Sequence, residues 1–339
     1  MSSVLKIESV VQKHYEVIDY LKGFSILTIV SMHLIQTYTT FLPGFVIKLA
    51  TAGGTGVHIF ILCSGFGLYL SYMRRPCGFG DFIRHRFGKI YIPYIVIITI
   101  SALVPFMYDG NKRILAYLSH VLLFKMFVPE FESSFGAHFW YISTIFQFYF
   151  CFIPLSRLKE KLQTKKFLIL SLAVSFLWWI FLAVSGLYEI RVWDSFFIQY
   201  LWEFSLGMCL ADYLGNGRII HIKMIYLVIT ACTGLGLATV VASFGGVFKV
   251  FNDIPGMIGY GSLALVLYEI NIKTWNGLIL WISEFSYEWY LIHILIFACF
   301  FKSIHADTLS MQLTVGVIAF IVSILLAIGY KKCWQLVRR

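Results

Sequence analysis

The feature that most constrains this chain is a series of ten long, mostly apolar segments. A transmembrane helix needs about 17–25 predominantly apolar residues to cross the hydrocarbon core of a bilayer. Such segments lie at 19–38, 56–73, 89–107, 139–156, 167–187, 196–213, 222–243, 254–270, 277–301 and 309–330. With 59% hydrophobic and only 13% charged residues, the chain lacks the polar surface that a soluble globule of 339 residues needs. The predicted fold is therefore all-α, a polytopic membrane helix bundle with about ten transmembrane helices.

The basic residues predict how this bundle is oriented. Most of the 27 Lys and Arg residues fall in alternate connections and in the two terminal segments. Cytoplasmic loops collect such residues, so both termini are expected in the cytoplasm. The stretch 113–128 is short and charged, and making it a span would invert every later loop. We therefore predict an interfacial or re-entrant helix there.

The charge and cysteine patterns argue against several classes of protein. Cytoplasmic loops account for the net charge of +10, so no nucleic-acid partner is expected. The seven cysteines are scattered without a C-x-x-C pair, which indicates neither a disulfide framework nor a zinc site. The N-terminal segment is too polar for a cleavable signal peptide. Because no repeat or linker divides the chain, residues 1–339 are expected to form a single membrane domain.

Ionisable side chains inside a span are candidates for function, because a charge in hydrocarbon is costly. The first span carries Asp19, Lys22 and His33. Lys22 and His33 are eleven residues apart, which is three helical turns plus roughly 20°, so they share one face about 16 Å apart. Two alternatives stay open. In the first, Asp19 and Lys22 only form a local ion pair with each other. In the second, His33 is only a hydrogen-bonded packing residue.

The second span begins with another histidine and continues with small residues. His58 stands near the outer end of this span, at about the depth of His33. Gly65 and Gly67 follow it, and glycines in a membrane helix let a second helix approach closely. Helix packing therefore explains these glycines better than chemistry does.

Two later spans add carboxylates and a third histidine. Glu203 lies in the sixth span, and the ninth carries Glu284 and Glu288 one turn apart, with His293 further out. Three histidines on different helices thus fall in the outer half of the bundle. General-base chemistry needs one histidine that a partner orients and that is kept from bulk water. No H-x-x-x-H or His/Glu spacing on one helix supports a metal ion, and none is predicted.

Four sets of residues follow one another in an informative order. They are DYLKG followed by His33, then GVHIFILCSGFGLYLS, then FIRHRFGKIYIPY with the later HFWYISTIFQFYFCFIP, and finally SYEWYLIH. In type, order and spacing they resemble the acyltransferase-3 family of integral membrane acyltransferases, which modify bacterial surface carbohydrates. The resemblance spans nearly the whole chain.

The resemblance implies an activity and a location. The family moves an acyl group, usually acetyl, from cytoplasmic acyl-CoA to a hydroxyl of a cell-surface or exported carbohydrate. It implies a multi-pass protein of the inner or plasma membrane with no bound cofactor, for which acetyl-CoA is a donor substrate. By position, Lys22 stands where the family has an arginine, and His33 where it has a functional histidine. Lysine keeps the charge but lacks the planar, bidentate guanidinium group.

Residues and resemblance together predict specific roles. His33 is expected to act as general base, with His58 and Glu288 as further catalytic candidates. His58, Glu203 or Glu288 is expected to orient the imidazole of His33. The residues expected to hold the phosphates of acyl-CoA are Lys22, Arg84, Arg86 and Lys89. The residues expected to contact substrate are Asp19, Trp140, Glu203, Tyr290 and His293. As an alternative, the basic loop only fixes topology and touches anionic lipid.

Two rival functions stay open. A transporter or exporter of a lipid-linked sugar or polysaccharide would use the same buried charges to bind a moving substrate. Such proteins often contain inverted repeats or helix pairs broken by Gly and Pro, and neither stands out here. The other rival is a different membrane acyltransferase family with a buried histidine.

Overall fold

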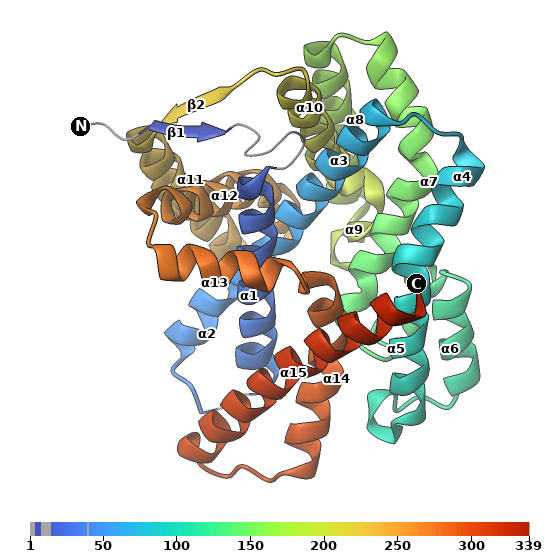
Figure 1. Ribbon diagram of the computed structural model, residues 1–339. Coiled ribbons are helices and arrows are strands. Elements are labelled where there is room, and N and C mark those ends of the chain that lie inside the picture. Colours follow the sequence, from blue (N-terminus) through green and yellow to red (C-terminus); the bar gives the residue numbers. More distant parts are fainter. Residues whose placement is uncertain (1–3, 8–14, 39–40, 339) are drawn as a thin grey trace.

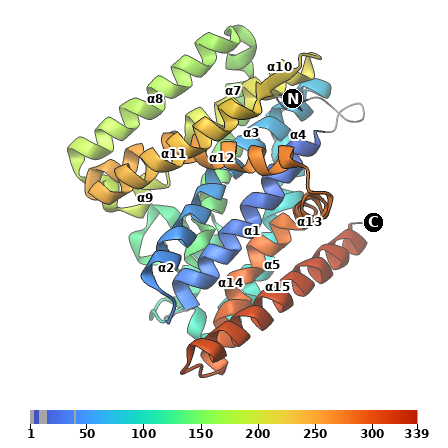
Figure 2. The same cartoon turned by 90° about the vertical axis from the view of Figure 1, so that its left-hand side faces the viewer.

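The chain folds as a bundle of helices, as its apolar segments predict (Figures 1 and 2). The computed structural model describes residues 4–7, 15–38 and 41–338. The helices are α1 (Glu16–Tyr38), α2 (Gly44–Thr51), α3 (Gly56–Arg74), α4 (Phe79–Arg86), α5 (Ile92–Leu103), α6 (Arg113–Val121), α7 (Trp140–Lys161), α8 (Thr164–Ser185), α9 (Arg191–Asp194), α10 (Leu201–Gly215), α11 (Met224–Phe244), α12 (Asp253–Ile270), α13 (Lys273–Ser283), α14 (Ser286–Ser303) and α15 (Leu309–Val337). The predicted all-α membrane fold is confirmed.

Seven helical segments of the described chain are long and apolar enough to cross a membrane. They are Glu16–Gln36, Gly44–Arg74, Phe79–Leu103, Ala137–Lys161, Thr164–Ser185, Met224–Phe244 and Leu309–Val337. The bent pair α13–α14 makes an eighth if it is one span. The predicted segments 196–213 and 254–270 correspond to the helices α10 and α12, which have 15 and 18 residues. The count of ten spans therefore stays a prediction.

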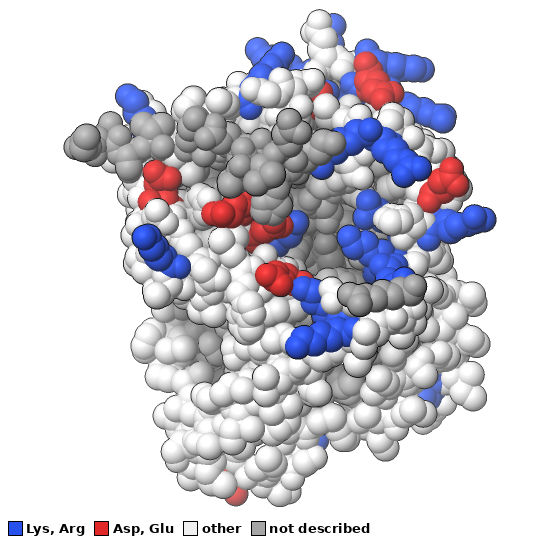
Figure 3. All heavy atoms as spheres, viewed as in Figure 1, with Lys and Arg blue, Asp and Glu red and all other residues white. Residues whose placement is uncertain are grey.

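Charged side chains are unevenly distributed over the surface. Figure 3 shows Lys and Arg gathered in the upper part of the view and around a hollow, whereas the lower part is almost without charge. This is the distribution expected of a bundle whose wider apolar zone faces lipid. The stretch 113–128 contains the nine-residue helix α6 and a three-residue 3-10 turn, Lys125–Phe127, and both are too short to cross a bilayer.

Two strands join the N-terminal segment to a distant loop. β1 (Val4–Ile7) pairs in antiparallel fashion with β2 (Ile220–Lys223), with Val4 opposite Lys223. Both segments were predicted to lie in the cytoplasm. Two strands can pair only if they lie on the same side of the membrane, so the pairing agrees with this prediction. The location of the termini themselves stays a prediction.

Helix α1 runs through the middle of the bundle and carries the first candidate residues. It contacts α3, α12, α13 and α14, and Figure 2 shows α8 and α11 on one side of it and α15 on the other. A Cβ atom on Gly23 would lie 2.0 Å from the carbonyl oxygen of Ile279, so α13 crosses α1 with the two backbones in contact. This close crossing lies beside Lys22.

Helices α3 and α10 also pack backbone to backbone. A Cβ atom on Gly65 would lie 2.1 Å from the oxygen of Phe204, and one on Gly207 would lie 2.1 Å from the oxygen of Leu62. The prediction that a small residue admits a second helix is thus confirmed for Gly65. It is wrong for Gly67, because a Cβ atom there would have no other atom within 4 Å.

The predicted ninth span, 277–301, is not one straight helix. It breaks into α13 and α14, whose axes differ by 80°. At the break, the N–H groups of Glu284 and Phe285 bond to carbonyls three residues earlier, so the last turn tightens. The buried Phe285 ring packs between Trp281 and Trp289. This packing favours the bend, which apolar content alone did not reveal.

The bend also corrects the expected placement of two carboxylates. Glu284 directly follows α13 and lies 3.4 Å from Lys331 of α15, whereas Glu288 lies in the first turn of α14. The two side chains are therefore not one turn apart on a single helix.

Candidate active site

His33 of α1 and His293 of α14 meet inside the bundle. Nδ1 of His33 lies 2.9 Å from Nε2 of His293, and Nδ1 of His293 lies 3.0 Å from the carbonyl oxygen of Trp289. A carbonyl oxygen only accepts, so Nδ1 of His293 carries the hydrogen and its Nε2 accepts when the ring is neutral. Nδ1 of His33 then donates, which leaves a lone pair on Nε2 of His33. This is the protonation state that a general base requires.

A third histidine joins this pair and was not predicted. The ring of His138 lies 6.1 Å from that of His33 and 4.9 Å from that of His293, centroid to centroid. Both of its ring nitrogens are buried without a hydrogen-bond partner among the described residues. A buried polar group without a partner is costly, so these nitrogens are suited to a substrate group. The signal available was the segment HFWYIS, which begins with this histidine.

The turn that presents His138 is held by a buried lysine. Lys125 is completely buried, and its Nζ donates to the carbonyl oxygens of Ser134 and Gly136 at 3.3 and 3.1 Å. Gly136 has a φ of +134°, and a Cβ atom there would lie 2.7 Å from the His138 ring. Only glycine fits at this position. The segment between α6 and α7 therefore sets where His138 lies.

Two tyrosines stand beside the histidines. The hydroxyl of Tyr290 donates to the carbonyl oxygen of His138, and its ring centroid lies 5.1 Å from that of His138. On its other side it lies 5.5 Å from the ring of Tyr141, at a steep angle. The Tyr141 hydroxyl lies 3.4 Å from that of Ser64. Together Tyr141 and Tyr290 form an aromatic wall.

A cavity of about 440 Å³ lies against this wall. Tyr141, Tyr290 and Phe60 line one end of it, and a group of basic side chains lines the other. None of His33, His138 and His293 is among its lining residues. The aromatic wall thus separates the cavity from the three histidines.

Three of the four residues predicted to bind phosphate meet at the basic end. Lys22, Arg86 and Lys89 line the cavity, together with His85, which was not predicted. Lys89 lies in a π-helical turn, Phe87–Tyr91, between α4 and α5, and such turns are frequent at functional sites. Arg84 is exposed and lines neither this cavity nor its neighbour.

A second hollow of about 570 Å³ continues the first. The two share Leu68, Ser71, His85 and Arg86, and the second adds Arg75 and Phe152. From Phe152 to Tyr141, both on α7, the combined space extends over eleven residues, about 16 Å of helix. It is therefore elongated, basic at one end and aromatic at the other.

Lys22 also forms the local ion pair with Asp19 that was considered as an alternative to a functional role. Its Nζ lies 3.0 Å from Oδ1 of Asp19, so the two side chains form an ion pair one turn apart on α1. Glu288 is half-buried, and its charge interacts with those of Lys331 and Lys89. Within the described residues, Glu288 has no hydrogen bond to a histidine. Its predicted catalytic role stays a prediction.

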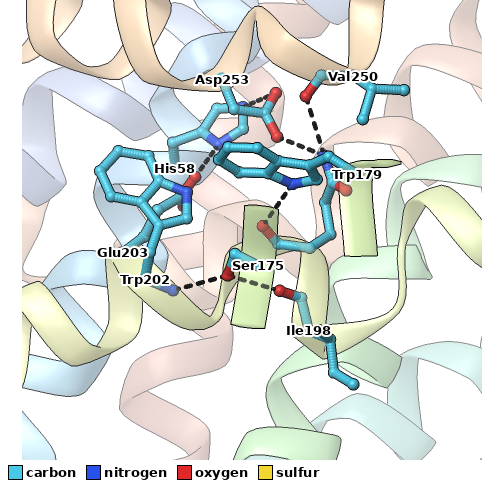
Figure 4. A network of polar contacts seen from close by, with 9 residues as sticks. His58, Ser175, Trp179, Ile198, Trp202, Glu203, Val250 and Asp253 are labelled. Atoms are coloured by element: carbon cyan, nitrogen blue, oxygen red, sulfur yellow. Dashed lines mark hydrogen bonds and ion pairs between the residues drawn. The ribbon is translucent and has the colours of Figure 1, made fainter. Parts of the chain in front are cut away.

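His58 and Glu203 lie apart from the three histidines, in a cluster of their own. Figure 4 shows the imidazole of His58 between the carboxylates of Glu203 and Asp253. Nδ1 of His58 lies 2.7 Å from Glu203 Oε1, and Nε2 lies 3.6 Å from Asp253 Oδ1. The amide of Gln199 donates to the other oxygen of Asp253 at 2.8 Å. Asp253 was not predicted.

This cluster is also the one group of three possible metal-ligating residues found among the described residues. However, the two nitrogens of His58 point to different carboxylates. One ligand atom from each of the three residues nevertheless lies within 4.8 Å of the other two. The geometry is that of a histidine held between two carboxylates, which joins α3, α10 and α12.

Trp140, one of the predicted substrate residues, is stacked with the side chain of Arg191. The guanidinium of Arg191 lies 4.7 Å above the Trp140 ring and 3.3 Å from Asp194. The Trp140 ring also packs against that of Tyr200, with 5.8 Å between centroids. Arg191 was not predicted, and its charge acts on His33.

Comparison with known proteins gives one match. A family model described as an acyltransferase domain, Acyl_transf_3, matches residues 15–330. No curated protein and no solved structure matches the chain. The matched range contains every residue of the sites described above.

Proposed function

Because the chain belongs to the acyltransferase-3 family and is a membrane acyltransferase, we propose that it acylates a carbohydrate hydroxyl from acyl-CoA. The acyl group is acetyl in the first instance, the donor enters from the cytoplasm, and the acceptor is a cell-surface or exported carbohydrate. The protein acts in the inner or plasma membrane. His33 is the general base.

The observation that carries this proposal is the hydrogen-bonded chain from Trp289 through His293 to His33. It fixes the tautomer of two neutral rings and leaves Nε2 of His33 as the free base. A histidine held in this way suits removal of a proton from a hydroxyl.

The two joined cavities support the choice of acyl-CoA as donor. Their basic end offers Lys22, Arg86 and Lys89 to the phosphates of the nucleotide. Their elongated form suits the pantetheine arm, which would place the thioester at the aromatic end. From there the acyl carbon has to pass the aromatic wall to meet His33.

The reaction then proceeds by addition and elimination. Nε2 of His33 takes the proton of the acceptor hydroxyl while the hydroxyl oxygen attacks the thioester carbonyl carbon. The carbonyl oxygen becomes an oxyanion, and His138, with its unpartnered ring nitrogens, is the candidate donor to it. Collapse breaks the C–S bond, and the CoA sulfur takes the proton from His33. The products are the O-acyl ester and free CoA.

Purified protein in lipid nanodiscs, given radiolabelled acetyl-CoA and a panel of octyl glycosides, tests this proposal. We expect thioester consumption and label in the glycoside ester. His33→Ala should lower the rate by about 10²–10⁴-fold. His305→Ala is the matched control, because His305 is exposed and outside the site. Passage of a sugar across the membrane without thioester consumption would instead support an exporter.

A further inference from the structure

The cluster around His58 takes no part in the proposed reaction, and its composition is that of a metal site. It brings one imidazole and two carboxylates together from three helices: His58 of α3, Glu203 of α10 and Asp253 of α12 (Figure 4). The expectation of no metal ion rested on spacings along single helices. Such spacings cannot reveal residues that only the fold brings together.

The two nitrogens of His58 have different surroundings. Nδ1 lies 2.7 Å from Oε1 of Glu203, which is a hydrogen-bond distance. Nε2 lies 3.6 Å from Oδ1 of Asp253, which is too far for a direct hydrogen bond. Two ligands that each lie about 2.0–2.2 Å from one zinc ion in a tetrahedral arrangement are roughly 3.3–3.6 Å apart. The separation of Nε2 and Oδ1 therefore suits an ion between them, whereas that of Nδ1 and Oε1 does not.

Both sides of this gap are held in place by a further residue. Nδ1 of His58 donates to Glu203, which fixes the ring with Nε2 toward Asp253. The amide of Gln199 donates to Oδ2 of Asp253 at 2.8 Å, which leaves Oδ1 toward His58. Histidines that bind a metal ion almost always donate their other N–H group to a carboxylate, carbonyl or water, and ligating carboxylates are themselves hydrogen-bonded. The cluster has both features.

Two buried oxygens beside the gap also call for a donor. Oε2 of Glu203 and Oε1 of Gln199 have no hydrogen-bond partner among the described residues, and the two side chains are 0% and 1% exposed. The other polar atom of each group bonds to His58 or Asp253, so both oxygens lie next to the cluster. A carboxylate or amide oxygen only accepts, and water bound to a metal ion would donate to it.

We propose that Nε2 of His58 and Oδ1 of Asp253 bind a divalent transition-metal ion of the zinc type. Glu203 orients His58, Gln199 orients Asp253, and water completes the coordination. An imidazole ligand suits Zn²⁺, whereas Mg²⁺ and Ca²⁺ prefer oxygen ligands. The side chains of His58 and Asp253 are 16% and 15% exposed, so an ion has access to them. The ion links α3 to α12, and the inference does not depend on the proposed acyl transfer.

Metal analysis of the full-length protein in lipid nanodiscs, free of any affinity tag, tests this. The protein is treated with EDTA, equilibrated with ZnCl₂ and dialysed. We expect about one zinc per chain by mass spectrometry of the metal, and a melting temperature that rises with ZnCl₂ because the ion binds the folded state. The same concentration of MgCl₂ should not raise it.

Variants show where the zinc binds. His58→Gln and Asp253→Asn should each lower zinc affinity at least tenfold, and Glu203→Gln, which alters only the orienting residue, by about 10–100-fold. His305→Gln is the matched control, because His305 is exposed and far from the cluster in the chain, and it should bind zinc as the wild type does.

Three results would overturn the inference. The first is a wild type that takes up no zinc and melts at the same temperature with and without ZnCl₂, which decides the matter even if a variant fails to fold. The second is zinc bound equally well by wild type, His58→Gln and Asp253→Asn, which would mean adventitious binding elsewhere. The third is an equal rise in melting temperature with MgCl₂, which would contradict an imidazole ligand.

Discussion

Nδ1 of His33 lies 2.9 Å from Nε2 of His293, although the two residues are 260 positions apart in the chain. One histidine is anchored to the backbone of its own helix, and it determines which nitrogen of the other carries the lone pair. The proposed base and the residue proposed to orient it therefore come from the first long helix and from the helix after the bend.

Replacing His293 should impair the reaction without impairing donor binding. His293→Ala leaves Nδ1 of His33 without its acceptor, so the ring loses its fixed tautomer. We expect kcat to fall by about 10–100-fold with the KM for acetyl-CoA little changed. Steady-state assays measure both constants, and His221→Ala, an exposed histidine in β2, serves as control. A change confined to KM would contradict the orienting role.

Arg86 and Arg84 form a natural pair for testing the donor site. Arg86 lines both cavities, and its Nε is buried without a hydrogen-bond partner in the described chain, whereas Arg84 is exposed outside them. Arg86→Gln should raise the KM for acetyl-CoA by about tenfold, because charge-assisted hydrogen bonds contribute about 1.5–3 kcal/mol. Arg84→Gln removes the same charge and should leave KM within twofold. Equal effects would indicate that the loop attracts the donor only through its total charge.

Gly65 and Gly67 allow a test of packing on a single helix. Gly65→Ala places a methyl group against the backbone of Phe204, which cannot move as a side chain can. We expect a loss of about 1–3 kcal/mol in stability and a lower melting temperature in detergent. Gly67→Ala, two residues away, meets open space and should melt like the wild type. Equal melting temperatures for the two variants would contradict the close crossing of α3 and α10.

The long apolar segments were predictable because the bilayer dictates their length and composition. Lys22 and His33 could also be singled out as candidate functional residues, because helical geometry places them on one face of the helix and charged side chains inside a span are rare. The pairing of His33 with His293 was not, because it depends on how distant helices pack. A single sequence carries no signal for such a contact.

Other site residues were hidden by where the predicted spans begin. His138 and Asp253 each stand one residue before a predicted span, at 139–156 and 254–270, so they were counted with the loops. In the structure both are drawn into the bundle, His138 by the turn around Gly136 and Asp253 by its bond from Gln199. The bend between α13 and α14 was hidden for a related reason, because it follows from packing of the Phe285 ring rather than from a loss of apolar character.

The buried Lys125 should make the stability of the segment 108–138 depend on pH. Burial lowers the pKa of Lys125 to about 7, against the opposing charge of Glu132 and with help from that of Arg191. An unfolded chain keeps this amine protonated up to about pH 10.4. Between about pH 7 and pH 10 the unfolded state therefore binds more protons, so stability rises with pH in this window, by up to roughly 4 kcal/mol.

The comparison with Lys125→Met isolates this effect. Methionine fills similar space without a charge, so the variant should lack the rise between pH 7 and pH 10, and below pH 7 both proteins should follow the same slope. Melting temperatures and protease resistance of the segment 108–138 measure this. His120 does not interfere with this comparison. Burial lowers its pKa well below its usual range, so its effect on stability occurs at acid pH and is the same in both proteins. A parallel pH profile for the two proteins above pH 7 would mean that Lys125 stays charged where it is buried, held by the carbonyls of Ser134 and Gly136.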